Sequence, residues 1–350
     1  MAGNDAITLS KADLLAFASG LFVAAGVARA MAEEWAGILV WANLRGVDSH
    51  GVIRIPRYLD LLRRKTINTA PDIRVEKRAG AVSIMEADRA PGVIAMKRAM
   101  EEAISRAREV SVGWCAARNV THTGAIGYFA LMAAEAGMAG IAMGASGPMM
   151  AYHGARVAGV SSNPLALAVP GKNRRPLLLD MSTANVAMGK ILGARDAGGE
   201  VPLGWGIDAE GRDTTDPKKI ATLLPVGGPK GSGLSLLIEC LTSLAVANPL
   251  VARALIEKNL AENPVQNGLA IAVDLAVFGD LDRFESEVDR LGDAVVALPR
   301  ASGVERILLP GERGYAVMAE REAGGIPISR GTWNRLVAAA EGLGVKPPAS

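Results

Sequence analysis

The stretch from Ala81 to Val120, AVSIMEADRAPGVIAMKRAMEEAISRAREVSVGWCAARNV, decides the fold class. Its opening AVSIMEA is a short apolar run, and its closing VSVGWCAARNV has the apolar pattern of a strand. Between them, GVIAMKRAMEEAISRAREV places apolar residues at helical spacing. A strand, a helix and a strand in succession indicate an α/β protein.

The segments that follow continue this alternation. GAIGYFALMAAEAG has a helical period and leads to GIAMGAS, while the Gly- and Asp-rich residues 198–217 are expected to form an ordered loop. GGPKGSGLSLLIECLTSLAVAN is glycine-rich for one turn and helical thereafter. ERILLPGERG predicts one more strand before two C-terminal helices. Buried strands are predicted in three further apolar runs, PLALAVP (164–170), PLLLDMS (176–182) and GLAIAVDLAVF (268–278).

The N-terminal segment is predicted to be helical. Ser10 and Asp13 resemble a capping box, and apolar residues follow at helical spacing. The run from Leu14 to Ala32 imitates a secretory signal, but Asp5 and Asp13 precede it in place of a positive region, and an amphipathic helix continues directly. We therefore expect a buried helix and a cytoplasmic protein. Since helical ends flank an α/β middle, both termini are expected to pack as one helical unit.

The composition favours a protein that binds small molecules. The 350 residues are 50% hydrophobic, which is enough for a substantial core. With 38 basic and 36 acidic side chains and no long block of one sign, the charge pattern of a nucleic-acid or membrane-surface binder is missing. Cys115 and Cys240 match no metal-ligand spacing, so buried, reduced thiols are expected.

The three histidines all lie in loops of small residues: His50 in VDSHGV, His122 in NVTHTGAIGY and His153 in AYHGAR. Glycines next to His50 and His122 allow a backbone to approach a ligand closely, so these two are candidate functional residues. We expect His153 to be structural. The three positions are too scattered for a histidine metal site, and no metal is predicted.

Two further side chains are candidates for chemistry. Asp180 ends an apolar run, where a carboxylate needs a partner. It could cap the next helix together with Ser182 and Thr183, or it could orient a histidine and raise the pKa of that imidazole. A histidine so paired would be protonated at neutral pH and could donate its proton as hydride arrives on the adjacent carbon. Arg54, four residues after His50, could bind a substrate carboxylate through two hydrogen bonds.

The common nucleotide-binding motifs are absent, since neither G-x-G-x-x-G nor a Walker loop occurs. GGPKGSG nevertheless places backbone amides and Lys230 at the start of a helix, which favours a bound anion. The alternative is an ordinary glycine-rich loop with a solvated lysine.

Seven motifs, in order, resemble the malate/L-lactate dehydrogenase family, which is unrelated to the Rossmann-type enzymes of similar name. They are DSHGVIRIPRY, HTGAIGYFALMAAEAGMAGIAMGAS, SSNPLALAVP, LLLDMSTANVAMGKI, PLGWGIDAEGRDTTDP, GGPKGSGLSLLIE and LLPGERG. The resemblance implies a homodimer with an α/β, non-Rossmann, mixed-sheet fold that binds NAD or NADP. It also implies interconversion of a 2-hydroxy acid and a 2-oxo acid, or of an amino acid and its imine.

The resemblance also implies a division of the chain. Residues 1–75 would form a helical segment that packs with the C-terminal helices in 310–350. Residues 76–120 and 225–309 would form the α/β cofactor-binding domain, and 121–224 a central α/β domain with much of the active site.

Roles follow from the same resemblance. His50 matches the proton donor, Asp180 its supporting carboxylate, and Arg54 the arginine near the substrate carboxylate. Tyr58 is expected beside the substrate, and His122 beside both the substrate and the nicotinamide. The residues that match cofactor-contacting stretches are Met181, Ser182, Thr183, Pro229, Lys230, Gly231, Gly311, Glu312 and Arg313.

The sequence departs from the family pattern near the expected site. Thr123 stands where phenylalanine is common, and GGPKGSG replaces the frequent GGHKGYG, so the substrate pocket could be enlarged or reshaped. The alternative within the class is a cyclic imino acid reductase acting on a piperideine- or pyrroline-2-carboxylate. More distant alternatives are a Schiff-base lyase with Lys230 as nucleophile and a non-catalytic small-molecule sensor.

Overall fold

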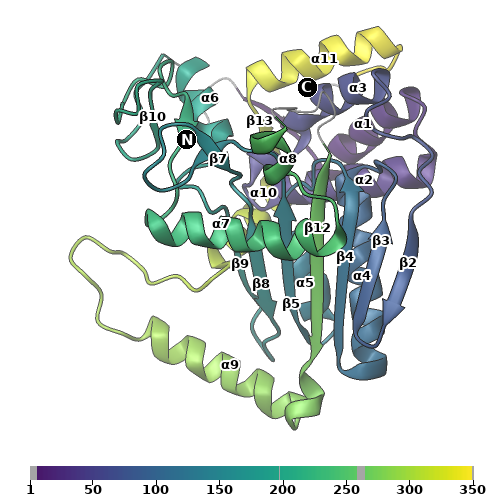
Figure 1. Cartoon of the computed structure of the whole chain (residues 1–350), viewed down its shortest axis with the longest axis vertical. Coiled ribbons are helices and arrows are strands. Elements are labelled where there is room, and N and C mark those ends of the chain that lie inside the picture. The colour runs from purple at the N-terminus through teal and green to yellow at the C-terminus, as the bar shows by residue number, and fades with distance from the viewer. Residues whose placement is uncertain (1–5, 197, 258–264, 349–350) are drawn as a thin grey trace.

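A seven-stranded mixed sheet forms the centre of the molecule (Figure 1). The computed structural model describes residues 6–196, 198–257 and 265–348. Only β3 and β4 pair in parallel in this sheet, and the other neighbours are antiparallel. The predicted α/β mixed-sheet class is therefore confirmed. The strands in spatial order are β2 (Arg74–Ala79), β3 (Val82–Glu86), β4 (Val112–Val120), β12 (Gln266–Asp274), β5 (Met138–Ala145), β8 (Leu165–Val169) and β9 (Leu177–Met181).

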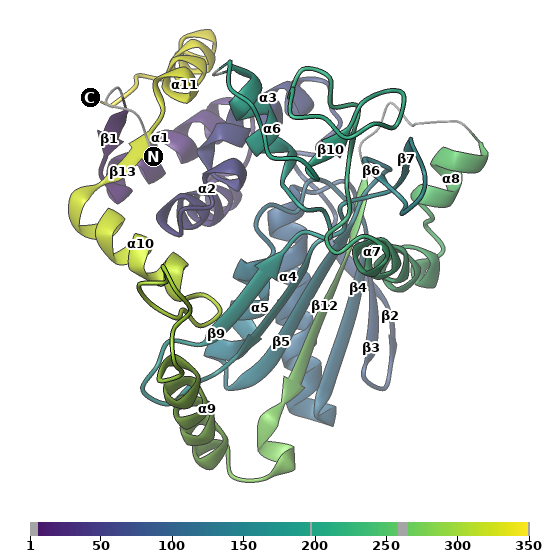
Figure 2. The same ribbon diagram turned by 90° about the vertical axis from the view of Figure 1, so that its left-hand side faces the viewer.

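Helices cover both faces of this sheet. α4 (Gly92–Val110) and α5 (Gly127–Glu135) pack on one face, and α7 (Pro229–Thr242) lies across the other (Figures 1 and 2). Small residues let α4 come close, because a Cβ added to Gly113 of β4 would lie 1.8 Å from the Ala103 carbonyl oxygen. The main hydrophobic core fills this interface and extends into the terminal helices.

The two termini form one helical unit, as predicted. β1 (Ile7–Leu9) pairs antiparallel with β13 (Ile326–Ile328), and Phe17 contacts Trp333 with ring centroids 5.6 Å apart. Ser10 caps the first helix, since its Oγ accepts a hydrogen bond of 3.0 Å from the backbone N–H of Asp13. The helices of this unit are α1 (Lys11–Ala24), α2 (Arg29–Leu44), α3 (Ile55–Arg63), α10 (Glu312–Gly324) and α11 (Arg330–Leu343).

A second, four-stranded sheet and several short elements lie around these two units. The strands of this sheet, in order, are β10 (Gly206–Ile207), β11 (Thr222–Leu223), β6 (Met150–Ala151) and β7 (Ala158–Val160). The remaining α-helices are α6 (Met188–Asp196), α8 (Val251–Ile256) and α9 (Leu281–Val296). The 3-10 helices are η1 (Asp48–His50), η2 (Val52–Arg54), η3 (Leu244–Val246) and η4 (Leu275–Phe278).

Most predicted strands are confirmed, and two predictions need correction. β9 is a strand but not a buried one, because it forms the sheet edge and Leu179 is 41% exposed. ERILLPGERG contains no strand: its first part is irregular, and α10 begins at Glu312. The Glu312 carboxylate accepts a hydrogen bond of 3.0 Å from the Leu309 N–H. The last residues of this segment therefore form the start of a helix and not a strand.

The N-terminal run and the cysteines differ in detail from expectation. The run from Leu14 to Ala32 is not one helix, because α1 ends at Ala24 and α2 begins at Arg29. Asp5, which argued against a signal, lies outside the described residues. Cys115 is buried as expected, whereas Cys240 on α7 is only half-buried. Among the described helices, none has both the length and the apolar character needed to cross a membrane.

Strand direction decides where a ligand site can form. β3, β4, β5 and β9 run in the same direction, so their carboxyl ends lie at the same end of the sheet. His122 follows β4 and Asp180 lies at the end of β9, which brings two predicted site residues to this end of the sheet. Ligands of open α/β sheets bind characteristically beyond the carboxyl ends of the strands.

Candidate active site

His50 and Arg54 lie on one compact turn between α2 and α3. The Nδ1 atom of His50 is 2.9 Å from Ser49 Oγ, and Arg54 Nε donates a hydrogen bond of 2.6 Å to the Ser49 carbonyl oxygen. Within the described residues, the two terminal nitrogens of Arg54 have no hydrogen-bond partner. They are therefore available to an anion beside His50.

His122 is fixed by Tyr58, which is only 1% exposed. The Tyr58 hydroxyl lies 2.7 Å from His122 Nδ1, and the Gly124 N–H donates to the same nitrogen at 3.3 Å. Because Nδ1 accepts from a backbone amide, we assign the imidazole hydrogen to Nε2 and make Tyr58 a donor. His122 therefore presents an N–H donor on its other side.

The predicted residues His50, Arg54, Tyr58 and His122 are brought together by the fold. The rings of His50 and His122 are stacked with centroids 5.6 Å apart and planes inclined by 17°. Tyr58 lies against the same ring of His122, with centroids 5.9 Å apart. Two imidazoles and one guanidinium thus surround one small region.

Both imidazoles are neutral at neutral pH in the ligand-free chain. Burial, reinforced by the positive charge of Arg54, lowers the pKa of His50 from 6.5 to about 4. Burial also holds the pKa of His122 well below 6.5, with further contributions from Arg54 and His50. The environment of His50 in the ligand-free chain thus favours the neutral imidazole, and not the protonated form expected of a histidine paired with Asp180.

Asp180 binds a helix start and not His50. Its Oδ2 accepts a hydrogen bond of 2.9 Å from the N–H of Gly127, the first residue of α5, and none joins it to His50 in the described chain. The surrounding protein desolvates this carboxylate and raises its pKa to about 6, although the Gly127 bond and Arg45 act in the opposite direction. The helix that Asp180 contacts is α5, whereas the sequence suggested capping the helix that follows.

Arg45 is a site residue that the sequence did not single out. The residue is 5% exposed, its Cζ lies 4.0 Å from the Tyr315 ring centroid, and its Nη2 donates a hydrogen bond of 3.3 Å to the Gly311 carbonyl oxygen. Arg45 thus links Asp180, whose pKa it lowers, to the start of α10. Its position in RGVDSHG, five residues before His50, was the available signal.

The expected cofactor-contacting stretches at Met181–Thr183 and Pro229–Gly231 meet each other. The Val226 N–H donates a hydrogen bond of 2.9 Å to the Thr183 carbonyl oxygen, and a Cβ on Gly231 would lie 2.7 Å from that oxygen. Gly227 and Gly228 have φ of 59° and 60°, a left-handed conformation that glycine adopts without strain.

This junction fits a phosphate-bearing cofactor. Pro229 at the start of the 14-residue α7 has no N–H, and the amides of Lys230 and Gly231 donate to the carbonyl oxygens of Gly227 and Val226. The positive end of the helix dipole and the exposed Lys230 side chain, which has no hydrogen bond or ion pair within the described residues, are what favour an anion here. Thr183 Oγ1 is buried and has no hydrogen-bond partner in the part of the chain that the structure describes. An anion at this junction would pair with the Lys230 ammonium, whereas the Thr183 hydroxyl lies beneath the surface.

His153 and Glu312 both make contacts within the chain. The backbone N–H of His153 donates a hydrogen bond of 2.8 Å to Ser232 Oγ, and its ring lies beside Gly228, so it borders the start of α7. Glu312 is engaged by Leu309 and by Arg174, whose Nη1 is 3.6 Å away. Of the predicted group at the start of α10, Gly311 contacts Leu178 of β9, and Arg313 is exposed.

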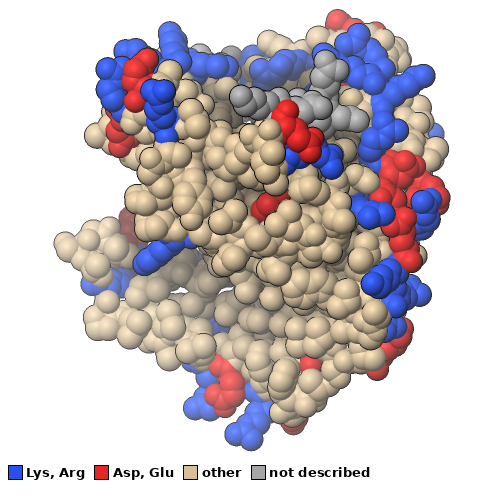
Figure 3. Space-filling model, viewed as in Figure 1, with Lys and Arg blue, Asp and Glu red and all other residues tan. Residues whose placement is uncertain are grey.

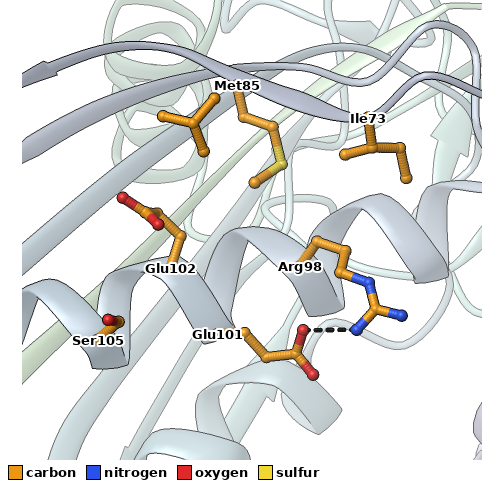
Figure 4. A pocket seen from close by; sticks show the side chains of 7 residues that line it. Ile73, Met85, Arg98, Glu101, Glu102 and Ser105 are labelled. Carbon is orange, nitrogen blue, oxygen red and sulfur yellow. Dashed lines mark hydrogen bonds and ion pairs between the residues drawn. The ribbon is translucent and has the colours of Figure 1, made fainter.

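Two hollows elsewhere on the surface offer no comparable chemistry. One, of about 370 Å³, lies between β3 and α4 (Figure 4), where Arg98 pairs with Glu101 at 2.7 Å and Glu102 accepts a hydrogen bond from Ser83. Its charged groups are thus already paired. The other, of about 650 Å³, is lined by the loop from Asp208 to Lys219, in which Arg212 binds Asp208.

Comparison with known proteins agrees with this geometry. Residues 9–337 match the model of the family described as malate/L-lactate dehydrogenase. The chain is 34% identical to a malate dehydrogenase of Pyrococcus horikoshii over 97% of this chain and 96% of that protein. The solved structure titled malate dehydrogenase from that organism matches with a TM-score of 0.90, 32% identity and 99% coverage of both chains.

Two other relatives name different substrates. The chain is 32% identical to ureidoglycolate dehydrogenase (NAD(+)) of Escherichia coli O157:H7 over 90% of this chain and 91% of the relative. The structure of a delta1-piperideine-2-carboxylate reductase from Pseudomonas syringae pvar. tomato matches with a TM-score of 0.84 and 28% identity, over 95% of this chain and all of that one. Curated relatives include dehydrogenases named for NAD(+) and for NADP(+).

The lowered pKa of His50 gives a prediction for the ligand-free protein. In a histidine-selective NMR titration, the His50 resonance, assigned by its loss in His50→Gln, should titrate near pH 4. Unfolding restores the ordinary value of 6.5, so the contribution of neutral His50 to stability is complete above pH 6.5 and is lost as the pH falls toward 4. Over that window wild type should lose up to about 1.4 kcal/mol per pH unit relative to His50→Gln. A midpoint at pH 6 or above would contradict the described environment.

Proposed function

Because the chain belongs to the malate/L-lactate dehydrogenase family, we propose that it is an oxidoreductase that uses NAD or NADP to interconvert a small 2-hydroxy acid and its 2-oxo acid. The observation that best supports this is the turn on which His50 and Arg54 share Ser49 as a hydrogen-bond partner. A proton-transferring group and a carboxylate-binding group are there held at a fixed separation.

Arg54 would bind the substrate carboxylate. Its Nε is already bound to the Ser49 carbonyl oxygen, which fixes the guanidinium plane and leaves two terminal nitrogens for a bidentate contact. A carboxylate held there places the neighbouring C2 oxygen beside the imidazoles. Tyr58 contributes indirectly, because its buried hydroxyl orients His122.

His50 would move the proton on the C2 oxygen. With a pKa of about 4 it is neutral at pH 7, the form that accepts a proton from the hydroxyl of a 2-hydroxy acid. In the reverse direction, the negative charge of a bound substrate carboxylate favours the protonated imidazole, which can then donate. His122, with hydrogen on Nε2, would donate a hydrogen bond to a substrate or nicotinamide oxygen.

The cofactor would bind along Met181–Thr183 and the start of α7. When bound, the nicotinamide supplies or accepts the hydride. The Lys230 ammonium at the positive end of the α7 dipole would hold a phosphate. Asp180, bound to Gly127, would position the start of α5 and the preceding His122 loop.

A cyclic imino acid reductase is the second candidate. The structural match to the piperideine-2-carboxylate reductase favours it, and Thr123, where phenylalanine is common in the family, is buried beside Gly144. The same His50 would then protonate the imine nitrogen while Arg54 binds the ring carboxylate. The two reactions differ only in the atom that receives the proton.

We also propose that the protein is a homodimer in the cytoplasm. Small and polar residues of α7 face its own sheet, whereas Leu237, Leu241 and Leu244 form an outward stripe, with Leu237 62% exposed. Charged residues lie mostly at the rim of this face (Figure 3). An exposed apolar face of this kind suits a two-fold contact with a second copy. Two free cysteines, Cys115 and Cys240, suit a reducing compartment.

The reaction is tested by oxidation of NADH and NADPH against a panel of 2-oxo acids and cyclic imines. With the best substrate, His50→Gln should lower kcat by about 10²–10⁴-fold, the usual contribution of general acid–base catalysis, with little change in cofactor affinity. Arg54→Lys should mainly raise KM for the carboxylate substrate, because lysine keeps the positive charge but cannot make the bidentate contact of a guanidinium. Near-normal kcat in His50→Gln would remove His50 from the mechanism.

The dimer is tested by sedimentation velocity. Leu237→Glu would bury a carboxylate in the proposed contact and should convert the protein to a monomer. Leu203, which is similarly exposed on the loop before β10, provides the matched control, and Leu203→Glu should leave the dimer intact. A wild-type monomer at micromolar concentration, or a dimer that survives Leu237→Glu, would exclude this face.

A further inference from the structure

The turn that contains His50 is fastened on both sides by one buried amide. Asn43, near the end of α2, is 2% exposed. Its Nδ2 donates a hydrogen bond of 2.7 Å to Asp48 Oδ1, and its Oδ1 accepts one of 2.8 Å from the Val52 N–H. Asp48 lies two residues before His50 and Val52 two residues after it. The backbone on each side of the imidazole is thus tied to the same side chain.

Arg321 of α10 closes this arrangement from the far end of the chain. Its Nη1 donates to Asp48 Oδ1 at 2.6 Å and its Nη2 to Asp48 Oδ2 at 3.1 Å, a bidentate ion pair. Nη1 also donates to the Asn43 carbonyl oxygen. The Arg321 side chain is only 15% exposed, whereas that of Asp48 is 48% exposed, so the guanidinium is held in place while the carboxylate stays partly open to solvent.

Gly51 shows how closely the amide approaches the turn. A Cβ added to Gly51 would lie 2.1 Å from Asn43 Oδ1. No larger residue fits at the position after His50 while Asn43 keeps its bond to Val52. The glycine of the SHG motif is therefore required by this contact.

The imidazole is stacked on His122 but makes few hydrogen bonds of its own. In the described chain the one hydrogen bond of the His50 ring is that of Nδ1 with Ser49, whose hydroxyl is on the same turn. The place of the ring relative to Arg54 and His122 is consequently set by the backbone from Asp48 to Val52. A shift of about 1 Å in a reacting group can lower a rate by about a hundredfold.

We propose that Asn43 and Arg321 are positioning residues for His50, acting through Asp48 and Val52. This rests on the proposed role of His50 in proton transfer. Neither side chain touches the substrate in this account. They fix the distance between the imidazole and the arginine that binds the carboxylate.

The test compares Arg321→Met, Arg321→Lys and Asp48→Asn with a matched control on the same helix. Lys11 of α1 pairs with Glu322 of α10 at 3.3 Å, so Lys11→Met removes an ion pair between α10 and α1 without touching the His50 turn. The measurements are kcat, substrate KM, cofactor Kd and the NMR titration of His50 in the ligand-free protein. Circular dichroism establishes that each variant is folded.

We expect Arg321→Met to lower kcat by about ten- to a hundredfold, with cofactor Kd within about twofold of wild type. Arg321→Lys should retain more kcat than Arg321→Met, because lysine keeps the positive charge although it cannot make the bidentate contact of a guanidinium. Asp48→Asn should also lower kcat, although it retains an acceptor for Asn43. In Arg321→Met and Asp48→Asn the titration midpoint of His50 should rise toward 6.5 as the loosened turn becomes solvated. Lys11→Met should change neither kcat nor the titration midpoint of His50.

An Arg321→Met protein with the kcat and His50 titration of Lys11→Met would overturn the proposal, even if its melting temperature fell. The titration separates this result from a failure of the proposed function. If His50→Gln retains full activity, His50 is not the proton-transferring group, yet an altered His50 titration in Arg321→Met would still show that Arg321 positions the ring. An unaltered titration would refute positioning independently of activity.

Discussion

Hydrogen bonds link the residues that follow α2 to α10 and to the residue just before it. They hold the turn that contains His50 and the start of α10 together. Arg321 binds Asp48 from one side, and Arg45 binds the Gly311 carbonyl oxygen from the other. These contacts join residues more than 260 positions apart in the chain. They fix how the terminal helical unit lies relative to the carboxyl ends of the strands. The His50 turn, the end of β9 and the start of α10 depend on that arrangement for their mutual distance.

Local patterns in the sequence were sufficient for much of the fold and part of the site. The apolar runs predicted β3, β4, β8 and β12, and the small-residue loops pointed to His50 and His122. Arg54 could be predicted because it shares a turn with His50. In each case the relevant neighbours are close in the chain, or the strand pattern alone decides the element.

The predictions that failed depend on long-range contacts. Asp180 was predicted to cap the next helix or to support a histidine, and its hydrogen bond in the described chain goes to the start of α5, a helix more than 50 residues earlier. Asn43 and Arg321 were not singled out, because a buried asparagine and a lone arginine have no distinctive local pattern, and Arg45 had only its position five residues before His50 as a signal. The strand expected in ERILLPGERG fails because Glu312 binds the Leu309 N–H and starts a helix.

Two neutral imidazoles beside a guanidinium make the site ready for an anion. Arg54 lowers the pKa of both histidines, and a bound carboxylate would neutralise that charge. Substrate binding and the protonation of His50 are thereby coupled, which links recognition of the carboxylate to the proton that the reaction needs. The proposed cofactor junction lies after β9, at Thr183, and on α7, at Lys230, whereas His50 lies on the turn between α2 and α3. The hydride of the cofactor and the proton of His50 would therefore come to the substrate from different parts of the fold.

The most direct test of this account is a crystal structure of the protein with NADH and oxamate, a non-reacting analogue of a 2-oxo acid. The account predicts that the oxamate carboxylate binds the terminal nitrogens of Arg54 and that its C2 oxygen lies within hydrogen-bond distance of His50 Nε2. It also predicts the cofactor phosphates at the first turn of α7. Oxamate bound away from Arg54, or a C2 oxygen facing a group other than His50, would contradict the central claim.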